Sequence, residues 1–306
     1  MINYDNYIVG FLDVLGQKEA FISDGKYLGD IEDDSELNIE ELTEKLAKAH
    51  AKTVRTIEIL RDGFKSYYDS YTSESDIKVS IPDEKVELFK EMRKTEINQQ
   101  VFSDCIVSYC KLKPKGEYYS QVVNSVYEIL SAFGAMFLLS LAREKPFRAG
   151  IDLGLATPFL DEGIYGPAFF KAYELESKIA QYPRIVIGED IINFLMNLLH
   201  KNPQLDDQIE YDLLWCQGIS RKCLDMIVKD VDGVWILDYC GDDFLKGISE
   251  HSPDSSLEDV INKAYKFVHS EWKNYKDSGD RKLAHRYFLL RTYLISRLTK
   301  KEDPDK

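Results

Sequence analysis

The chain has 306 residues, of which 44% are hydrophobic and 30% charged, a composition typical of an ordered protein with a full hydrophobic core. Its formal net charge of −14 excludes the broad basic face that a nucleic-acid groove requires. An acidic protein can still bind a nucleotide through metal ions, backbone N–H groups and a few well-placed cations.

The cysteines and the N-terminus indicate a cytoplasmic protein. The cysteines form neither a CxxC pair nor a zinc-binding spacing, so we expect reduced thiols; they are Cys105, Cys110, Cys216, Cys223 and Cys240. No basic region or cleavage site of a signal peptide is present at the N-terminus. The apolar segment 122–142 is long enough for a membrane span, but it carries Glu128 and several polar residues and is expected to be a buried helix.

The first half of the chain predicts a strand, three helices and a hairpin. Residues 7–15 form an apolar run that predicts a buried strand, followed by a helix from about residue 17. An acidic surface loop over 23–41 and a helix over 39–60 come next. Further elements are expected in this order: a polar break over 73–82, a short helix over 84–93, and a hairpin over 99–112 with a Ser-Asp pair at its turn.

The second half alternates between helices and strands and ends in helices. After the long helix that reaches residue 142, the expected elements are a strand over 147–154, a helix over 167–180, a strand over 184–187 and a helix over 189–200. Residues 225–239 predict a hairpin with Asp232-Gly233 at its turn. Residues 257–300 predict two helices around a polar break at 276–280.

Common catalytic motifs are absent from the sequence, which contains no GxxxxGK[ST], GxGxxG, HExxH or GxSxG string. The histidines have no metal-ligand spacing and are expected to be ordinary core or surface residues; they are His50, His200, His251, His269 and His285. Carboxylates in unusual places are therefore the stronger candidates for chemistry.

Two aspartates stand among apolar residues. Asp13 lies near the end of the first strand (FLDVLG), and Asp104 lies between apolar runs (VFSDCIVSY). A buried carboxylate costs several kcal/mol unless it is paired, hydrated or bound to a metal. Either aspartate alone could equally be a structural cap, but the two together favour a shared site for a hard cation. Gly16 permits a tight turn, so that the next helix N-terminus could face an anion.

Four stretches, in order, resemble the class III nucleotidyl cyclases: FLDVLG (11–16), FSDCIVSY (102–109), FRAGIDLG (147–154) and YGPAFFKAYELE (165–176). The resemblance covers about the first two-thirds of the chain. It implies an α/β (α+β) fold, the class III cyclase catalytic fold, in which a mostly antiparallel sheet is flanked by helices. We expect a catalytic domain over 1–240, with a helical and acidic insertion over about 24–98. A C-terminal helical extension over 241–306 would pack on the same domain.

The resemblance also implies a metal site. Asp13 and Asp104 would hold two Mn²⁺ or Mg²⁺ ions, with the backbone carbonyl of Val14 as a further ligand. Arg148 would contact the triphosphate, although a solvated arginine at a strand end fits the sequence equally well.

The nucleotide site departs from the purine cyclase pattern. By the resemblance, Phe11 and the backbone amides of Leu15 and Gly16 would bind the nucleotide. However, the two groups that read a purine edge are missing: the family's lysine is replaced by Gln100 and its aspartate by Gly163. An amide side chain both donates and accepts hydrogen bonds, which suits the O4/N3 edge of uracil.

The family's transition-state residues are missing as well. The positions of its catalytic Asn and Arg are occupied by Phe170 and Glu174, which cannot perform the same task. Lys171 and Arg184 are the nearby cations that could replace them, and the sequence does not distinguish between the two.

These departures, together with the Tyr-rich segment RYFLLRTYL (286–294), resemble the bacterial antiphage pyrimidine cyclases of Pycsar systems. That branch implies cyclisation of UTP, or of CTP, to a 3′,5′-cyclic nucleotide and pyrophosphate by two-metal catalysis. The product would activate a separate effector. The branch also implies a homodimer with shared active sites. Residues 129–141 and the Phe169-Phe170 pair are candidate contact surfaces, although each fits the ordinary hydrophobic core equally well.

Two alternatives stay open. One is an adenylate cyclase with an unusual base pocket. The other is a non-catalytic cyclase-fold module that binds a nucleotide or a partner, and the missing Asn and Arg favour it. Retention of Asp13 and Asp104 argues against a non-catalytic protein, because a buried acid pair without a metal is unfavourable. Neither a nucleic acid nor a membrane is expected as a partner.

Overall fold

The computed structural model describes residues 3–16, 39–72, 86–113, 118–159, 163–201, 207–249 and 257–298. The strands are β1 (Asp5–Val14), β2 (Ile97–Phe102), β3 (Cys105–Lys111), β4 (Phe147–Phe159), β5 (Gly163–Tyr165), β6 (Ile185–Ile187), β7 (Ile227–Lys229) and β8 (Trp235–Leu237). The helices are α2 (Ile39–Thr72), α3 (Val86–Arg93), α4 (Ser120–Ala142), α5 (Pro167–Glu174), α6 (Glu189–Leu199), α7 (Asp207–Asp225), α8 (Asp242–Ser249), α9 (Leu257–Ser278) and α10 (Arg281–Leu298). A π-helical turn, Leu175–Ile179, continues α5.

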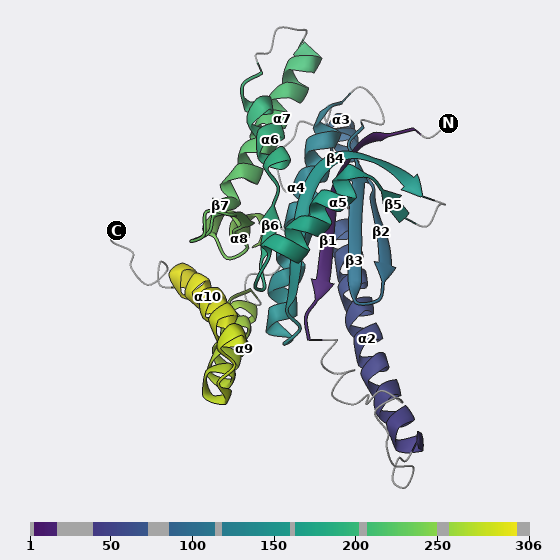
Figure 1. Ribbon diagram of the computed structural model, residues 1–306. Coiled ribbons are helices and arrows are strands. Elements are labelled where there is room, and N and C mark those ends of the chain that lie inside the picture. The colour runs from purple at the N-terminus through teal and green to yellow at the C-terminus, as the bar shows by residue number, and fades with distance from the viewer. Residues whose placement is uncertain are drawn as a thin grey trace.

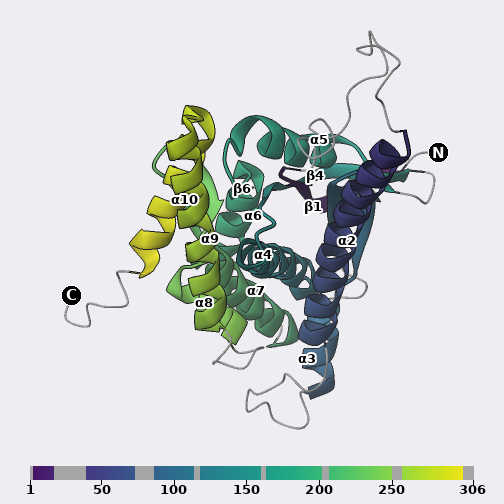
Figure 2. The same ribbon diagram turned by 90° about the horizontal axis from the view of Figure 1, so that it is seen from below.

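The strands form one sheet in the order β2-β3-β1-β4-β6-β8-β7, and β5 pairs with the far end of β4 (Figure 1). Neighbouring strands are antiparallel except β4 and β6, which run parallel. Helix α5 packs against β1 and β4, while α4 lies among α2, α7, α8 and α9 (Figure 2). The expected α/β architecture, with a mostly antiparallel sheet flanked by helices, is confirmed.

Strand β1 is apolar on both faces because both faces are covered. Ile8, Leu12 and Val14 belong to the large core beneath α4. Val9 and Phe11, which alternate with them, belong to a smaller core beneath α5. This arrangement explains why the strand reads as a continuous apolar run rather than as an alternating pattern.

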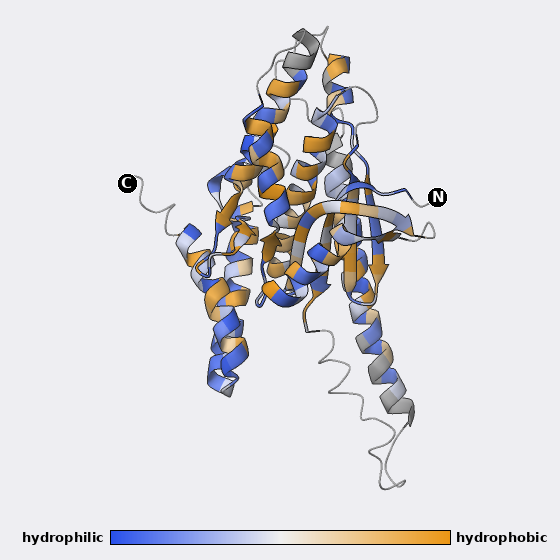
Figure 3. Cartoon of the chain, turned by 45° about the horizontal axis from the view of Figure 1, so that its top comes forward, coloured by the Kyte–Doolittle hydropathy of each residue, from blue (hydrophilic) through white to orange (hydrophobic). Residues whose placement is uncertain are grey.

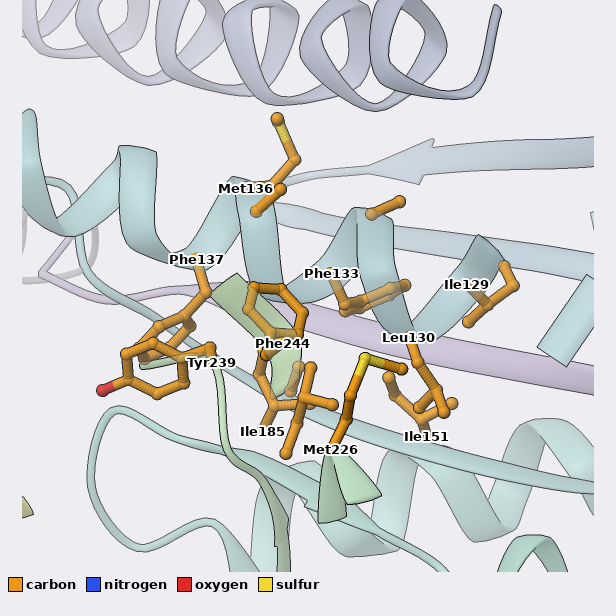
Figure 4. Packing of buried hydrophobic residues seen from close by; sticks show 14 of the residues in the cluster. Ile129, Leu130, Phe133, Met136, Phe137, Ile151, Ile185, Met226, Tyr239 and Phe244 are labelled. Atoms are coloured by element: carbon orange, nitrogen blue, oxygen red, sulfur yellow. The ribbon is translucent and has the colours of Figure 1, made fainter. Parts of the chain in front are cut away.

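Helix α4 is the centre of the large core. Phe133 and Phe137 are fully buried on it, and the Phe137 ring lies 4.6 Å from that of Tyr239 and 4.9 Å from that of Phe147 (Figure 4). Among the described residues α4 is the one helix long and apolar enough to cross a membrane, but 94% of its apolar window is buried inside the fold. The centre of the fold is accordingly mostly hydrophobic and the outer helical ends are mostly hydrophilic (Figure 3).

The burial of α4 corrects one expectation about assembly. Residues 129–141 were a candidate dimer surface, yet Ile129, Phe133 and Leu141 have no exposed side-chain surface. They are core residues, because the sheet covers one side of the helix and α2, α7 and α9 cover the others.

The C-terminal helices pack on the same core. Ile261, Ala264 and Val268 of α9 and Leu290 and Leu294 of α10 are buried in the cluster that contains the β1 side chains. Helices α9 and α10 also pack against each other, and α9 contacts α4.

Several elements differ from the expectations. Strand β4 continues to Phe159 rather than ending near residue 154, and α2 continues to Thr72. Helices α7 and α8 and strand β5 were not expected. The helix expected from residue 17, the break over 73–82 and the loop before residue 39 lie outside the described residues.

A close approach fixes α5 and its π-helical turn on the sheet. A Cβ atom at Gly150 of β4 would lie 2.3 Å from the carbonyl oxygen of Ala172 and 2.6 Å from Cβ of Leu175. Only glycine allows the helix to lie so near the strand. The turn that follows is thereby held above the start of β4.

Candidate active site

The end of β1, the β2–β3 turn and the starts of β3 and β4 meet at one end of the inner strands of the sheet. In the register of the sheet Asp13 of β1 lies opposite Cys105 of β3 on one side and opposite Arg148 of β4 on the other. Residues directly opposite in antiparallel strands point to the same face, so these three side chains lie together. Asp104 is in the β2–β3 turn beside them, and its carbonyl accepts a hydrogen bond of 3.1 Å from the Val14 N–H.

The Asp13, Asp104 and Cys105 side chains form a possible metal site. One ligand atom from each lies within 4.8 Å of the others. The Cys105 thiol donates to Oδ1 of Asp13 over 3.6 Å. Burial and the neighbouring carboxylates raise the pKa of Cys105 well above its usual value. Its soft sulfur is in any case a poor ligand for a hard cation.

The donor set fits Mg²⁺ or Mn²⁺. Both ions prefer carboxylate and carbonyl oxygens, and the site offers two carboxylates, both only partly exposed, beside the backbone of Val14. The Ser103 hydroxyl donates to Oδ1 of Asp104 over 2.8 Å and fixes the carboxylate at the turn.

Arg148 lies between two carboxylates. One of its terminal nitrogens is 3.1 Å from Oδ2 of Asp13 and 2.8 Å from Oε1 of Glu176, which is in the π-helical turn. Burial raises the pKa of Glu176 to about 7 despite the nearby guanidinium. Burial likewise raises the pKa of Asp13, although Arg148 opposes the change. Arg148 is thus the positive charge that both acids share.

The two positions that depart from the purine pattern are brought together. Gln100 lies on β2 and Gly163 begins β5, and a Cβ atom at residue 163 would lie 2.0 Å from Oε1 of Gln100. The Gln100 amide therefore occupies the space that any side chain at residue 163 would enter.

The other residues expected at the nucleotide site have different surroundings. Phe11 is buried, with ring centroids of Phe102, Phe169 and Tyr173 at 5.9, 5.9 and 5.3 Å. The Leu15 N–H donates to the Pro146 carbonyl over 2.9 Å, which fixes the end of β1 to the start of β4.

Gly16 has the expected turn geometry. Its φ of 82° lies in the left-handed region that glycine adopts without strain. The residues that follow it, where a helix N-terminus was expected, are outside the described part of the chain.

Arg184 is held by carboxylates of another element. Its guanidinium contacts Asp230 at 2.7 Å and Asp232 at 2.8 Å, donates to the Ile179 carbonyl over 2.8 Å, and lies 4.6 Å from the centre of the Tyr182 ring. The side chain is 3% exposed. These bonds tie the β7–β8 turn to the end of the π-helical turn.

Lys171, like Arg184, pairs with a carboxylate other than those of Asp13 and Asp104. It lies on the exposed side of α5 and forms an ion pair with Asp190 in the first turn of α6. Phe170 and Glu174, at the family's transition-state positions, are exposed, and Glu174 pairs with Lys178 at 2.6 Å.

Cys105 and Glu176, which lie beside Asp13 and Arg148, were not identified from the sequence as site residues. Cys105 directly follows Asp104, and Glu176 is the last letter of the stretch YGPAFFKAYELE. The signal for Glu176 was present in that stretch, but nothing in the sequence showed that its carboxylate reaches Arg148, because the contact depends on the helix lying close to Gly150.

No protein-family model matches the chain, and no curated protein sequence matches it. Among solved structures the chain is similar to the adenylyl cyclase CyaB from P. aeruginosa, with 15% identity over 64% of this chain and 83% of that chain and a TM-score of 0.34. Two structures of a bacterial light-regulated adenylyl cyclase are 11% and 10% identical, with TM-scores of 0.36 and 0.32. They match 73% and 86% of this chain and 58% and 99% of their own.

The shared ion pair makes a prediction about stability. Arg148→Ala leaves two neighbouring carboxylates without their cation, and we expect it to lower the free energy of unfolding by about 3 kcal/mol at pH 8. Adding Glu176→Gln removes one of the two charges and should restore part of that loss. Urea denaturation measures both values.

Arg61→Ala is the matched control. Arg61 pairs with Asp62 at the surface at 3.0 Å, so its loss should change stability by less than about 1 kcal/mol. A loss in Arg148→Ala no larger than this would show that Arg148 does not stabilise the two acids.

Proposed function

We propose that the chain is a nucleotide cyclase that converts a nucleoside triphosphate to a 3′,5′-cyclic nucleotide and pyrophosphate. The observation that carries this proposal is the placement of Asp13 and Asp104, whose carboxylates each offer an oxygen within 4.8 Å of the other, at the end of β1 and in the β2–β3 turn, with Arg148 beside Asp13. Two acids at this distance repel each other unless a cation lies near them, and they can hold divalent ions against a triphosphate.

The reaction is an in-line displacement within one nucleotide. The ribose 3′-oxygen bonds to the α-phosphorus, the bond from that phosphorus to the bridging oxygen breaks, pyrophosphate leaves, and the hydroxyl proton passes to solvent. Bound Mg²⁺ or Mn²⁺ ions would supply Lewis acidity that favours the 3′-alkoxide and neutralises the leaving phosphates. Asp13, Asp104 and the Val14 carbonyl would hold these ions.

Arg148 would then have a second role. An ion on Asp13 supplies the positive charge that Arg148 now provides, so the guanidinium becomes available to phosphate oxygens while Glu176 keeps it in place. Lys171 and Arg184 would contribute to phosphate binding only after release from Asp190 and from Asp230 and Asp232.

We propose a pyrimidine substrate, UTP in preference to CTP. Its support is the contact between Gln100 and Gly163, which are the two positions where the resembling purine cyclases carry a lysine and an aspartate. The Gln100 amide can both donate to and accept from a pyrimidine edge.

We also propose a homodimer that shares its active sites. An aromatic surface, defined as Phe102, Phe159, Tyr165, Phe170 and Tyr173, covers the outer side of β2, β4, β5 and α5, and each side chain is between 39% and 56% exposed. Neighbouring rings touch along it, with centroids of Tyr165 and Phe170 at 5.3 Å and of Phe159 and Tyr165 at 6.0 Å. Exposed rings in contact are typical of a protein interface.

In the cell, the proposed role is that of a cytoplasmic enzyme whose cyclic UMP or cyclic CMP product activates a separate effector in antiphage defence. This role rests on the sequence resemblance alone. A non-catalytic nucleotide-binding module is the second candidate, and the exposed Phe170 and the Glu174–Lys178 pair on α5 favour it. An adenylate cyclase is the third, and the assay below separates all three.

The metal site generates the first functional prediction. Purified protein incubated with each of the four nucleoside triphosphates and Mn²⁺ should form a cyclic product, identified by mass, and a chelator should abolish its formation. Asp13→Ala and Asp104→Ala should each reduce turnover at least about 100-fold while the protein stays folded by circular dichroism, because each removes a metal ligand.

Asp62→Ala is the control, since it removes an exposed carboxylate of α2 and should leave turnover unchanged. Full turnover in either Asp13→Ala or Asp104→Ala would refute the site, and a wild-type protein inactive with all four nucleotides would favour the non-catalytic module.

The base pocket generates the second prediction. Gln100→Lys combined with Gly163→Asp restores the purine-reading pair and should raise kcat/KM for ATP relative to UTP at least about tenfold. Gly163→Asp alone should lower activity with every nucleotide, because the new side chain collides with Gln100.

Gln99→Lys is the matched control, because it adds the same charge to the opposite face of β2, where Gln99 donates to Ser108 over 3.2 Å. A clear preference of the wild-type protein for ATP would instead support the adenylate cyclase.

The aromatic surface generates the third prediction. Phe170→Glu should shift the protein from dimer to monomer in sedimentation and reduce turnover, because it places a charge in a surface that is buried in the dimer. Mixing inactive Asp104→Ala with inactive Gln100→Ala subunits should restore activity, since one of the two composite sites is then intact.

Leu214→Glu on α7 is the matched control, with an apolar side chain that is 53% exposed away from the aromatic surface. A fully active monomer would exclude shared sites.

A further inference from the structure

A cavity of about 440 Å³ lies between the end of β1, the loop after α4 and the C-terminal helices. Leu15, Gly16 and Pro146 form one side of it, and Tyr182 lines it as well. Phe267 and Tyr275 of α9 and Tyr287 of α10 line the other. Its volume is within the range of sites that bind small molecules.

Cations dominate the polar lining of this cavity. It carries four of them, Lys52, Arg143, Lys145 and Arg286, against two carboxylates, Glu144 and Glu271. The chain as a whole has a net charge of −14, so the charge of this cavity lining is opposite in sign to that of the whole protein. A concave surface lined by one sign of charge attracts ions of the opposite sign.

Lys52 and Lys145 are held beside each other. They come from α2 and from the loop after α4, and burial together with the neighbouring Lys52 ammonium lowers the pKa of Lys145. Two like charges at close range are unfavourable by themselves, and an anion between them would remove the repulsion. The pair is therefore suited to a multiply charged anion.

Helix α10 adds positive potential from its N-terminus. Arg281 and Lys282 occupy its first turn, which has no acidic residue, and Asp280 caps the turn by accepting from the Leu283 N–H over 3.0 Å. Cations at a helix N-terminus oppose the helix dipole and lower helix stability. Arg286, one turn further, reaches both this cavity and an adjoining one of about 390 Å³. The charged and titratable residues that line the second cavity are Arg184, Arg281, Lys282, His285 and Arg286, with one carboxylate, Asp232.

We infer that this cavity binds a small phosphorylated molecule that carries two or more negative charges, held by Lys52, Arg143, Lys145 and Arg286. Its described lining contains none of Asp13, Asp104, Arg148 and Glu176. It adjoins the active-site elements at Leu15, Gly16 and Pro146, and at Tyr182, whose ring lies 4.6 Å from the Arg184 guanidinium. The phosphates have two possible sources: the triphosphate tail of a nucleotide that reaches past Gly16, or a separate phosphorylated ligand.

The first measurement is calorimetric titration of the full chain with inorganic pyrophosphate in EDTA, which removes any contribution from metal-bound anion. The wild-type protein should bind with a Kd below 1 mM, and the Kd should rise at least about tenfold in Lys145→Gln with Arg286→Gln, a loss of two cations. Binding should weaken with added salt.

The control is Lys48→Gln with Lys263→Gln, which removes two cations that form exposed pairs with Glu44 and Asp259 outside the cavity. Its Kd should stay within about twofold of wild type, since these lysines lie in solvent and do not line the cavity. Thermal unfolding confirms that both double variants are folded. No binding to the wild type, or equal weakening by both double variants, would overturn the inference.

A second measurement distinguishes the two sources. If the phosphates belong to the nucleotide, Lys145→Gln with Arg286→Gln raises KM for the substrate by the same factor as the Kd for pyrophosphate. If they belong to a separate ligand, KM is unchanged while pyrophosphate binding is lost. The calorimetric result stands even if the protein is not a cyclase, so failure of the cavity and failure of the proposed function are separable.

Discussion

Strand β1 is hydrogen-bonded on both edges and buried on both faces, and the arrangement of the site depends on this constraint. Its side chains alternate between the core beneath α4 and the core beneath α5. Asp13 falls on the α5 face and cannot turn to the other without shifting the register of both neighbouring strands. The apolar strand thus delivers a partly exposed carboxylate to a fixed position between Cys105 and Arg148, near the C-terminal end of the strand.

The charge balance at that point depends on one guanidinium. Arg148 lies 3.1 and 2.8 Å from the carboxylates of Asp13 and Glu176. If the proposed divalent ions bind Asp13 and Asp104, Arg148 would keep Glu176 as its partner and could take up an anionic one. Pairing of buried charges is the condition for holding several ionisable groups in a partly dry site. The high pKa of Glu176, about 7, means that protonation of this acid can also compensate for loss of the guanidinium.

Apolar runs and turn residues in the sequence were sufficient to predict individual hairpins and the central helix. The β2–β3 hairpin with Asp104 at its turn, the buried α4 and the β7–β8 hairpin follow from apolar runs and turn residues. The proximity of Asp13 and Asp104 was expected from their unusual setting among apolar residues and from the family resemblance, and the structure brings them together. The partners of Arg184 could not be predicted, because Asp230 and Asp232 are 46 and 48 residues away and meet it only through sheet pairing. The contact of Glu176 with Arg148 could not be predicted either, because it depends on the close approach of the helix to Gly150 of β4.

The π-helical turn after α5 has a consequence for sequence comparison. In it, the Ala180 N–H donates to the Leu175 carbonyl over 2.8 Å, a bond that spans five residues instead of four. Each extra residue in a helix rotates everything after it by about 100°. A helix that lacked the insertion would therefore present a different side chain toward Arg148 and enter β6 one position earlier. An alignment of this chain with a protein that carries a regular α-helix here needs a one-residue gap between 175 and 180, and without that gap every equivalence assigned from 181 through β6 would be displaced by one.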